Sequence, residues 1–305
     1  MRIIFMGTPE FAVTSLSAIL GAREEVVAVV TAPDKPAGRG QKLSESAVKQ
    51  FAVANGIPVL QPHKLKDPDF LAQLKSLNAD LQIVVAFRML PEAVWNMPPL
   101  GTINLHGSLL PQYRGAAPIN WAIMNGEAET GVTTFKLQHE IDTGDILLQD
   151  KMAIGNTETA GELHDRMKEI GAQLLVKTVK ELQSGSLKTN PQPSIFNLQP
   201  LKHAPKIFKE DCEIDWHTPM QIIFNRIRGL SPYPTAFTHL NGKTLKVFKA
   251  EMLSEKPQIT PGAYLTDHKT FLKFASADGF ISVKEIQMEG KKKMGIEEFL
   301  RGVRL

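Results

Sequence analysis

Cysteine is almost missing from this sequence of 305 residues, in which Cys212 is the only one. A single thiol excludes an intramolecular disulfide and any metal site built from several cysteines. Long apolar runs are missing as well, since no stretch approaches the roughly 18 residues that would span a bilayer. The opening residues, MRIIFMGTPEF, hold only a short apolar run before Gly7, which favours a first strand over a signal peptide. We therefore expect a cytoplasmic protein with no membrane partner.

Neither sign of charge dominates, because 35 lysines and arginines stand against 32 aspartates and glutamates. The small excess is uneven: residues 206–305 carry 16 basic and 12 acidic side chains, whereas residues 1–205 carry 19 and 20. An excess of this size by itself favours an ordinary solvated surface. Lysines clustered on one strand and one turn add the alternative of a surface that follows a phosphate backbone. These lysines are Lys243, Lys246, Lys249 and Lys291–Lys293.

Strand-like and helix-like segments alternate over the first 205 residues. This alternation predicts an α/β fold, with a Rossmann-like, mostly parallel sheet and helices on both faces. The first strand is not followed by GxGxxG, so the pattern does not indicate a dinucleotide site. The expected elements are strands over residues 2–6, 25–31 and 57–60 and helices over residues 10–20 and 44–55.

A segment with four prolines and little periodicity, residues 184–206, divides the chain and is typical of a linker. Before it, Thr159-x-x-Glu162 has the form of a capping box and predicts a helix that ends near Leu182. After it, one helix over 218–230 and several short strands separated by turns predict a small, OB-like β-barrel. We predict a first domain over residues 1–189, a linker over 190–206 and a second domain over 207–305.

An amide, an imidazole and a carboxylate follow two of the predicted strands. Asn104 and His106 fall at the carboxyl end of the strand formed by the run 101–105. Asp142 follows the run 131–137 in the turn IDTGD, whose tight part we expect at Thr143-Gly144. Residues two apart share one face of a strand, and ligands of open α/β sheets bind beyond the carboxyl ends of the strands. We therefore expect the three side chains to face one crevice.

This set of groups suits the transfer of an acyl group to an amine without a covalent intermediate. An amide can hold a developing oxyanion, an imidazole exchanges a proton near neutral pH, and a carboxylate orients and charges the imidazole. Taken alone, an Asn-x-His pair and an Asx-type turn are more often structural than catalytic.

The surrounding sequence favours the catalytic interpretation. NLHGSLLPQYRGAAPINWAIMNGE, followed by TGVTTFKLQHEIDTGDIL, resembles the 10-formyltetrahydrofolate-dependent formyltransferases, through HGSLLPxxRGxAP with a downstream DxGD. The resemblance covers nearly the whole chain and is weaker after about residue 205. It implies catalytic roles for Asn104, His106 and Asp142, with 10-formyltetrahydrofolate as co-substrate and no metal.

The same resemblance implies where the folate binds. Ser108, Leu109, Leu110 and Pro111 would contribute to the tetrahydrofolate site, and the strand 81–87 with the following RMLP would form the pterin wall. At Phe87-Arg88-Met89-Leu90 the sequence departs from the aromatic-glycine pair and the slightly longer loop typical of the family. The pocket is expected at this place, without residue assignments at 87–90.

Three segments point to members of the family that act on initiator methionyl-tRNA: FMGTPEFA, PDKPAGRGQKL and the C-terminal extension. The second is a basic, glycine-rich loop whose cations can bind phosphates, and the resemblance implies that it enters the acceptor arm. The C-terminal domain would then bind tRNA. We expect contacts from Lys35, Arg39, Lys42, Lys246 and Lys249, with Arg39 the first choice, and we expect a monomer. Family members that formylate an amino sugar nucleotide are the alternative, since they share the three catalytic residues and a similar extension.

Overall fold

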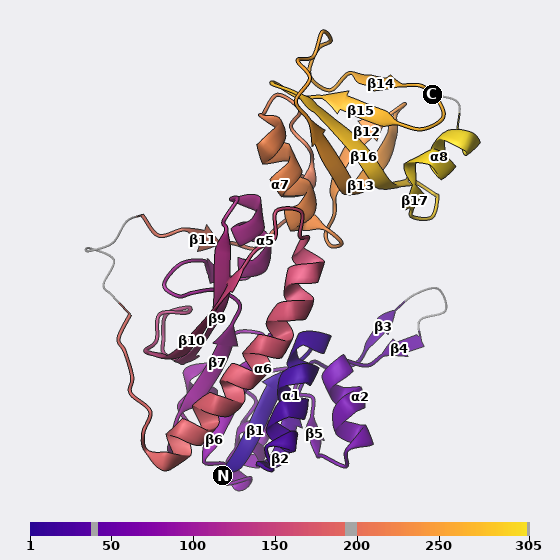
Figure 1. Ribbon diagram of the computed structural model, residues 1–305. Helices are drawn as coiled ribbons and strands as arrows, with labels where there is room; N and C mark the ends of the chain where they lie inside the picture. The colour runs from indigo at the N-terminus through magenta and orange to yellow at the C-terminus, as the bar shows by residue number, and fades with distance from the viewer. Residues whose placement is uncertain (38–41, 193–199, 304–305) are drawn as a thin grey trace. The chain divides into compact units, whose positions relative to one another are not determined.

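The computed structural model describes residues 1–37, 42–192 and 200–303, and the chain forms two compact units (Figure 1). No helix within these described ranges is long and apolar enough to cross a membrane. The predicted domain limits near residues 190 and 206 stay predictions. Unit 1 comprises Met1–Arg114, Gly131–Met152 and His164–Lys202, and unit 2 comprises Gly115–Thr130, Ala153–Leu163 and His203–Leu305.

A seven-stranded sheet forms the centre of unit 1, in the order β10-β9-β7-β6-β1-β2-β5. The neighbours from β7 to β5 are parallel, which confirms the predicted Rossmann-like sheet. The central strands are apolar on both faces, as expected where helices cover both sides. The strands are β1 (Arg2–Gly7), β2 (Glu25–Val30), β5 (Val59–Leu60), β6 (Leu81–Val85), β7 (Thr102–His106), β9 (Glu129–Lys136) and β10 (Ile146–Ala153).

Three helices of the first 184 residues begin at a side-chain cap. Ser46 accepts a hydrogen bond from the Lys49 amide at the start of one helix, and Asp67 caps another. The predicted capping box is confirmed, because Glu162 Oε2 accepts from the Thr159 amide at 2.8 Å and the Glu162 amide donates to Thr159 Oγ1 at 3.3 Å. Apart from α5, described below, the helices of this part of the chain are α1 (Glu10–Gly21), α2 (Ala47–Ala54), α3 (Pro68–Ser76), α4 (Glu92–Trp95) and α6 (Ala160–Ser184).

The direction of β9 corrects one expectation. β9 runs antiparallel to β7, with Thr133 opposite His106 and Lys136 opposite Ile103. It therefore ends beside the start of β7, at the end of the sheet away from His106. The loop 137–145 must return along the sheet to bring Asp142 back. Buried parallel and antiparallel strands have similar apolar sequences, so the run 131–137 did not reveal its direction.

Unit 2 contains an antiparallel sheet in the order β12-β13-β16-β15-β14, with β17 paired to β16. It curls into a half-barrel (Figure 1), in agreement with the predicted β-barrel class. Leu245 and Val247 of β13 and Ile281 and Val283 of β16 are fully buried, as the period of two requires. The strands are β12 (Ala236–Leu240), β13 (Lys243–Leu253), β14 (Tyr264–Thr266), β15 (Leu272–Ala275), β16 (Phe280–Met288) and β17 (Met294–Gly295).

Two helices of unit 2 come from distant parts of the sequence and pack together. Asn120 Nδ2 donates to the Gly229 carbonyl at 2.7 Å, and a Cβ at Gly229 would lie 2.6 Å from Met124 Cγ. Glycine therefore permits the close approach of these helices. The remaining elements are α5 (Pro118–Met124), α7 (Met220–Leu230), α8 (Ile296–Gly302), a 3₁₀ turn (Glu210–Cys212), β8 (Arg114–Gly115) and β11 (His203–Ala204).

Candidate active site

Asn104 and His106 lie on one face of β7, as their spacing predicts, and Leu105 between them is buried on the other face. Asn104 stands opposite Val84 on one side and Phe135 on the other, so hydrogen-bonded strands flank it. Its side chain is half-buried and has no hydrogen bond to any part of the chain that the structure describes. The amide is therefore available to a bound ligand.

His106 is 6% exposed and has one ring nitrogen committed. Its Nε2 lies 2.9 Å from the Tyr113 carbonyl oxygen. A carbonyl can only accept, so Nε2 carries the proton and donates it. The ring of buried Phe135 meets the imidazole edge-on, with centroids 6.4 Å apart. Nδ1 is consequently the nitrogen that can gain or lose a proton.

Asp142 lies next to that second nitrogen. The distance from His106 Nδ1 to Asp142 Oδ2 is 3.8 Å, and both side chains are largely buried. This separation is too long for a direct hydrogen bond but short enough for strong attraction to a protonated ring. The structure thus brings the carboxylate to the imidazole, although β9 runs in the direction opposite to the one we expected.

The turn that carries Asp142 differs in detail from the expected one. Its left-handed residue is Asp142 itself, with φ of 54°, and not a residue of the pair Thr143-Gly144. Gly144 has another role, because a Cβ there would lie 1.6 Å from the carbonyl oxygen of Lys136. Only glycine allows the loop to close against the end of β9, where the Lys136 amide donates to the Asp145 carbonyl at 3.0 Å.

Gln192 is the residue of the site that sequence reasoning missed. Its Nε2 donates to the carbonyl oxygens of Asp142 at 2.9 Å and Gly144 at 2.8 Å. Its Oε1 accepts from Arg114, at 3.2 Å from Nε and 2.5 Å from Nη2. Burial lowers the pKa of Arg114, and the negative charges of Asp142 and Glu140 oppose this change. Gln192 falls in the segment predicted to be a linker, and no local pattern marks it.

The predicted folate segment is mostly engaged with its own surroundings. Ser108 is fully buried, and its hydroxyl donates to the Gln112 carbonyl at 2.7 Å. Leu110 is 3% exposed, and its amide donates to Thr133 Oγ1 at 3.1 Å. Leu109 and Pro111 are half-buried, so within this segment their side chains are the two that a ligand can contact. A role of Ser108–Pro111 in folate binding stays a prediction.

In the segment that departs from the family pattern, Arg88 holds the chain in place. The Arg88 guanidinium donates to the carbonyls of Pro62 and His63, the latter at 3.1 Å, and lies 5.6 Å from the centroid of the Phe87 ring. Arg88 thereby fastens the chain after β6 to the loop after β5. Ala86 has φ of 48°, so the strand ends in a sharp change of direction.

The basic loop after β2 forms a hairpin where the structure describes it. β3 (Lys35–Ala37) pairs antiparallel with β4 (Lys42–Ser44). Asp34 at its base binds Lys49, and Gln61 Nε2 donates to Asp34 at 2.8 Å. These contacts lower the pKa of Asp34, chiefly through the Lys49 hydrogen bond. Lys35 is exposed, and Arg39 lies outside the described residues, so the predicted RNA contacts stay predictions.

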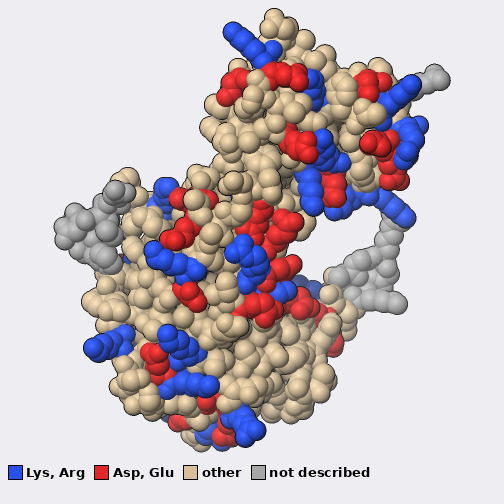
Figure 2. Space-filling view, in the orientation of Figure 1, with Lys and Arg blue, Asp and Glu red and all other residues tan. Residues whose placement is uncertain are grey.

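Lys246 and Lys249 lie on β13 of unit 2, opposite Gln287 and Glu285 of β16. Lys249 is exposed and Lys246 half-buried. Figure 2 shows lysine and arginine side chains over the β13 and β17 side of this unit, with acidic side chains between them. One lysine there is paired, since Lys293 lies 2.9 Å from Glu285. The surface is therefore mixed in charge.

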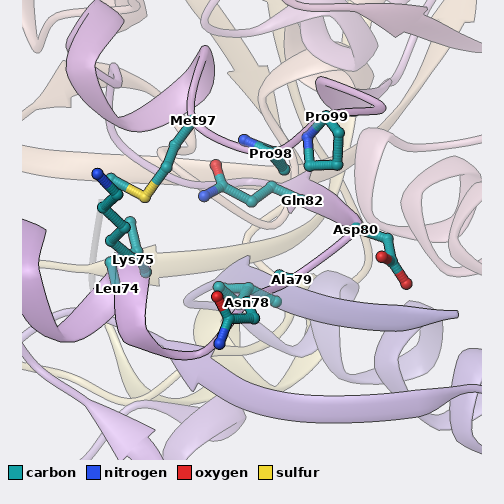
Figure 3. Close-up of a pocket in the computed structure, with 10 residues that line it drawn as sticks. Leu74, Lys75, Asn78, Ala79, Asp80, Gln82, Met97, Pro98 and Pro99 are labelled. Atoms are coloured by element: carbon teal, nitrogen blue, oxygen red, sulfur yellow. The ribbon is translucent and has the colours of Figure 1, made fainter.

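A pocket of about 300 Å³ lies at the other end of the sheet of unit 1. Asp80 and Gln82, at the start of β6, and Pro98 and Pro99, before β7, line it (Figure 3). Because His106 is at the opposite end of β7, this pocket is separate from the candidate active site. Among the described residues, no group of three histidine, cysteine, aspartate or glutamate side chains is arranged to hold a metal ion.

Comparison with protein families gives two matches. Residues 1–179 match the model described as "Formyl transferase", and residues 206–304 match "Formyl transferase, C-terminal domain". A methionyl-tRNA formyltransferase from Bacteroides fragilis is 50% identical over 310 residues, which covers 100% of this chain and 96% of that protein. The enzyme of the same name from Parabacteroides distasonis is 53% identical over 309 residues, covering 99% and 95%.

Solved structures with the same fold are more distant in sequence. An N-formyltransferase from Helicobacter canadensis, in complex with folinic acid and dTDP-3-aminofucose, has a TM-score of 0.68 at 21% identity, covering 96% of this chain and 100% of that one. HypX from Aquifex aeolicus in complex with tetrahydrofolic acid has a TM-score of 0.66 at 21% identity. The match covers 99% of this chain but 48% of HypX.

Proposed function

This chain belongs to the formyl transferase family, and we propose that it transfers the formyl group of 10-formyltetrahydrofolate to the α-amine of methionine on initiator methionyl-tRNA. Relatives about half identical over nearly their full length carry that activity in their names. The observation that supports the chemistry most directly is the unpaired amide of Asn104 beside the His106–Asp142 pair. A group that must bind a carbonyl oxygen needs a free donor, and Asn104 has one.

Asn104 and His106 act on the formyl oxygen in this proposal. Its negative charge rises as the amine attacks, and the Asn104 amide donates to it. A protonated His106 directs Nδ1–H into the same crevice, because Nε2–H is already bound to the Tyr113 carbonyl. The carboxylate of Asp142, 3.8 Å from Nδ1, lies close enough to attract the positive charge of a protonated ring. The folate supplies the activated formyl group.

The bonds and protons balance without a covalent enzyme intermediate. A bond forms between the methionine nitrogen and the formyl carbon, and the bond from that carbon to N10 of the folate breaks. The amine loses one proton, and N10 gains one. An aminoacyl-ester amine is less basic than a lysine side chain, so a useful neutral fraction exists near pH 7. His106 Nδ1 and Asp142 provide the route for the proton between the two nitrogens.

The RNA is held by cations outside the crevice in this proposal. Lys35, Arg39 and Lys42 bind the acceptor arm, and Lys246 and Lys249 bind phosphates of the tRNA body. Removing the last two charges by substitution with glutamine should weaken binding and make the logarithmic salt slope less steep by about two units. An unchanged slope would contradict contacts from β13.

The proposed function is tested by supplying purified protein and 10-formyltetrahydrofolate with one acceptor at a time. The acceptors are charged initiator tRNA, charged elongator tRNA and an amino sugar nucleotide. Formylation of the initiator species is the expected result. Formylation of only the sugar nucleotide would overturn the tRNA assignment. If Asn104→Ala and Asp142→Ala both kept wild-type single-turnover rates, the assigned chemistry would be wrong.

The proposal includes a monomeric enzyme in the cytoplasm, where charged tRNA and the ribosome are found. Light scattering tests the first part, and a mass of two chains of 33.7 kDa would contradict it. Fractionation of cells tests the second part, and recovery of the protein with membranes would contradict that.

A further inference from the structure

We propose that Gln192 is a positioning residue of the active site: its amide holds the Asp142 loop so that the carboxylate stays beside His106, and Arg114 holds that amide in the correct orientation. The inference rests on the proposed function, because it assigns a step of that reaction to Asp142. It moves the active site beyond the sheet and into the segment expected to be a linker.

All of the hydrogen-bonding groups of the Gln192 side chain are in use. The NH₂ group has two N–H donors, and the two loop carbonyls that accept from it belong to Asp142 and Gly144. The Oε1 atom accepts from the Arg114 fork. Since the guanidinium can only donate, Arg114 forces Oε1 towards itself and NH₂ towards the loop. An inverted amide would set oxygen against two carbonyl oxygens.

The loop requires a support of this kind. It runs back from the far end of β9, and its key residue, Asp142, has a left-handed backbone with φ of 54°. Such a conformation is uncommon for residues other than glycine, and aspartate is one of the few that adopt it readily. Gln192 binds the carbonyl oxygens of Asp142 and Gly144, on either side of Thr143. These two hydrogen bonds keep the backbone of Asp142 from changing its conformation.

Gln192 is itself held at the required distance. The backbone of Asn190 pairs with Ile146 at the start of β10, through hydrogen bonds of 2.8 and 2.9 Å. Gln192 lies two residues after Asn190, and Gly144 lies two residues before Ile146. This antiparallel pairing directs the Gln192 side chain to the loop rather than to solvent.

Gln192→Ala is the first test, with Asn190→Ala as the matched control. Displacement of a catalytic group by about 1 Å can cost roughly a hundredfold in rate, so we expect Gln192→Ala to lower kcat about 10- to 100-fold. KM for the folate and for the tRNA should change little, because Gln192 contacts loop carbonyls and Arg114. Asn190 is exposed and pairs through its backbone, so its alanine variant should match wild type.

Gln192→Glu separates the contact with Arg114 from the contacts with the two loop carbonyls. A carboxylate keeps the acceptor for Arg114 but offers no donor to the Asp142 and Gly144 carbonyls. We expect kcat to fall at least as far as in Gln192→Ala, because the second carboxylate oxygen would face the two carbonyl oxygens that the amide holds. A Gln192→Glu enzyme with wild-type kcat would overturn the proposal.

Comparing Gln192→Ala in the wild-type and Asp142→Asn backgrounds distinguishes a positioning role from a merely structural one. Once the carboxylate is gone, its position no longer matters, so adding Gln192→Ala to Asp142→Asn should change kcat less than about threefold. Equal losses in both backgrounds would overturn the positioning role while leaving formyl transfer intact. If the wild type uses a different amine, the same comparison is made with that amine. A wild-type enzyme that formylates no amine overturns the proposed function and this inference together.

Discussion

The two halves of the candidate active site are held in place by different means. Asn104 and His106 sit on β7, between two hydrogen-bonded strands, and their positions follow from the regular ladder. Asp142 sits on a loop whose place depends on one glycine contact and on a side-chain amide 50 residues away. We call Asn104 and His106 the strand half of the site and Asp142 the loop half. Substitution can remove a reactive group of the strand half but can hardly move it, whereas the carboxylate of the loop half can be displaced while it is still present. Variants can separate these two kinds of failure.

The largest fall in kcat should come from Asn104→Ala, which removes the side-chain amide of the strand half. Removal of one oxyanion donor typically costs about 100- to 1000-fold in kcat, and Asn104 is the unpaired amide on that strand. The melting temperature should hardly change, because no described partner is lost. Single-turnover formylation measures this, with the exposed Asn156→Ala as control. A loss below about tenfold would place the oxyanion contact elsewhere.

Gly144→Ala should displace the loop half while leaving every reactive group in the protein. A Cβ there would lie 1.6 Å from the Lys136 carbonyl oxygen, so the loop must move. We expect kcat to fall about 100-fold, together with a lower melting temperature. Gly21→Ala is the matched control, since nothing lies within 4 Å of its Cβ in a helix, and it should be neutral or slightly stabilising. Wild-type kcat in Gly144→Ala would show that Asp142 need not be fixed.

Arg114→Ala tests the outer support of the loop. Gln192 keeps its two donors but loses the fork that orients it, so we expect kcat to fall by about threefold to tenfold, less than in Gln192→Ala. Arg114→Lys retains the charge near Asp142 and Glu140 and should recover part of the loss. Steady-state kinetics of the three variants measure the order. If kcat were lower in Arg114→Ala than in Gln192→Ala, the result would indicate direct contact between Arg114 and substrate.

The smallest effect is expected from Thr143→Val, inside the loop. It removes the hydroxyl that accepts from Gln138 at 2.9 Å and donates to the Glu140 carbonyl at 3.1 Å. Both partners are exposed and can turn to water, so the change in kcat should be below about threefold. A greater loss would mean that the loop is held from within as much as by Gln192.

The sequence predicted the strand half of the site better than the loop half. The pairing of Asn104 with His106 on one strand face, and the cap at Thr159, depend on neighbours within three residues and were predicted correctly. The direction of β9 was not, because a buried strand has the same composition either way. Gln192 was missed because a hydrogen bond to a backbone carbonyl far along the chain leaves no periodic trace. The catalytic, folate and RNA roles of individual residues stay predictions.

The hydrogen bond from His106 to the Tyr113 carbonyl gives the protein an internal spectroscopic probe. Nε2 donates its proton to that carbonyl oxygen, so its ¹⁵N resonance should be that of a protonated nitrogen in the resting protein. The resonance of Nδ1 reports separately on the side of the ring that faces Asp142. With selectively labelled histidine, the charge of one atom can then be followed in the working enzyme as each substrate is added.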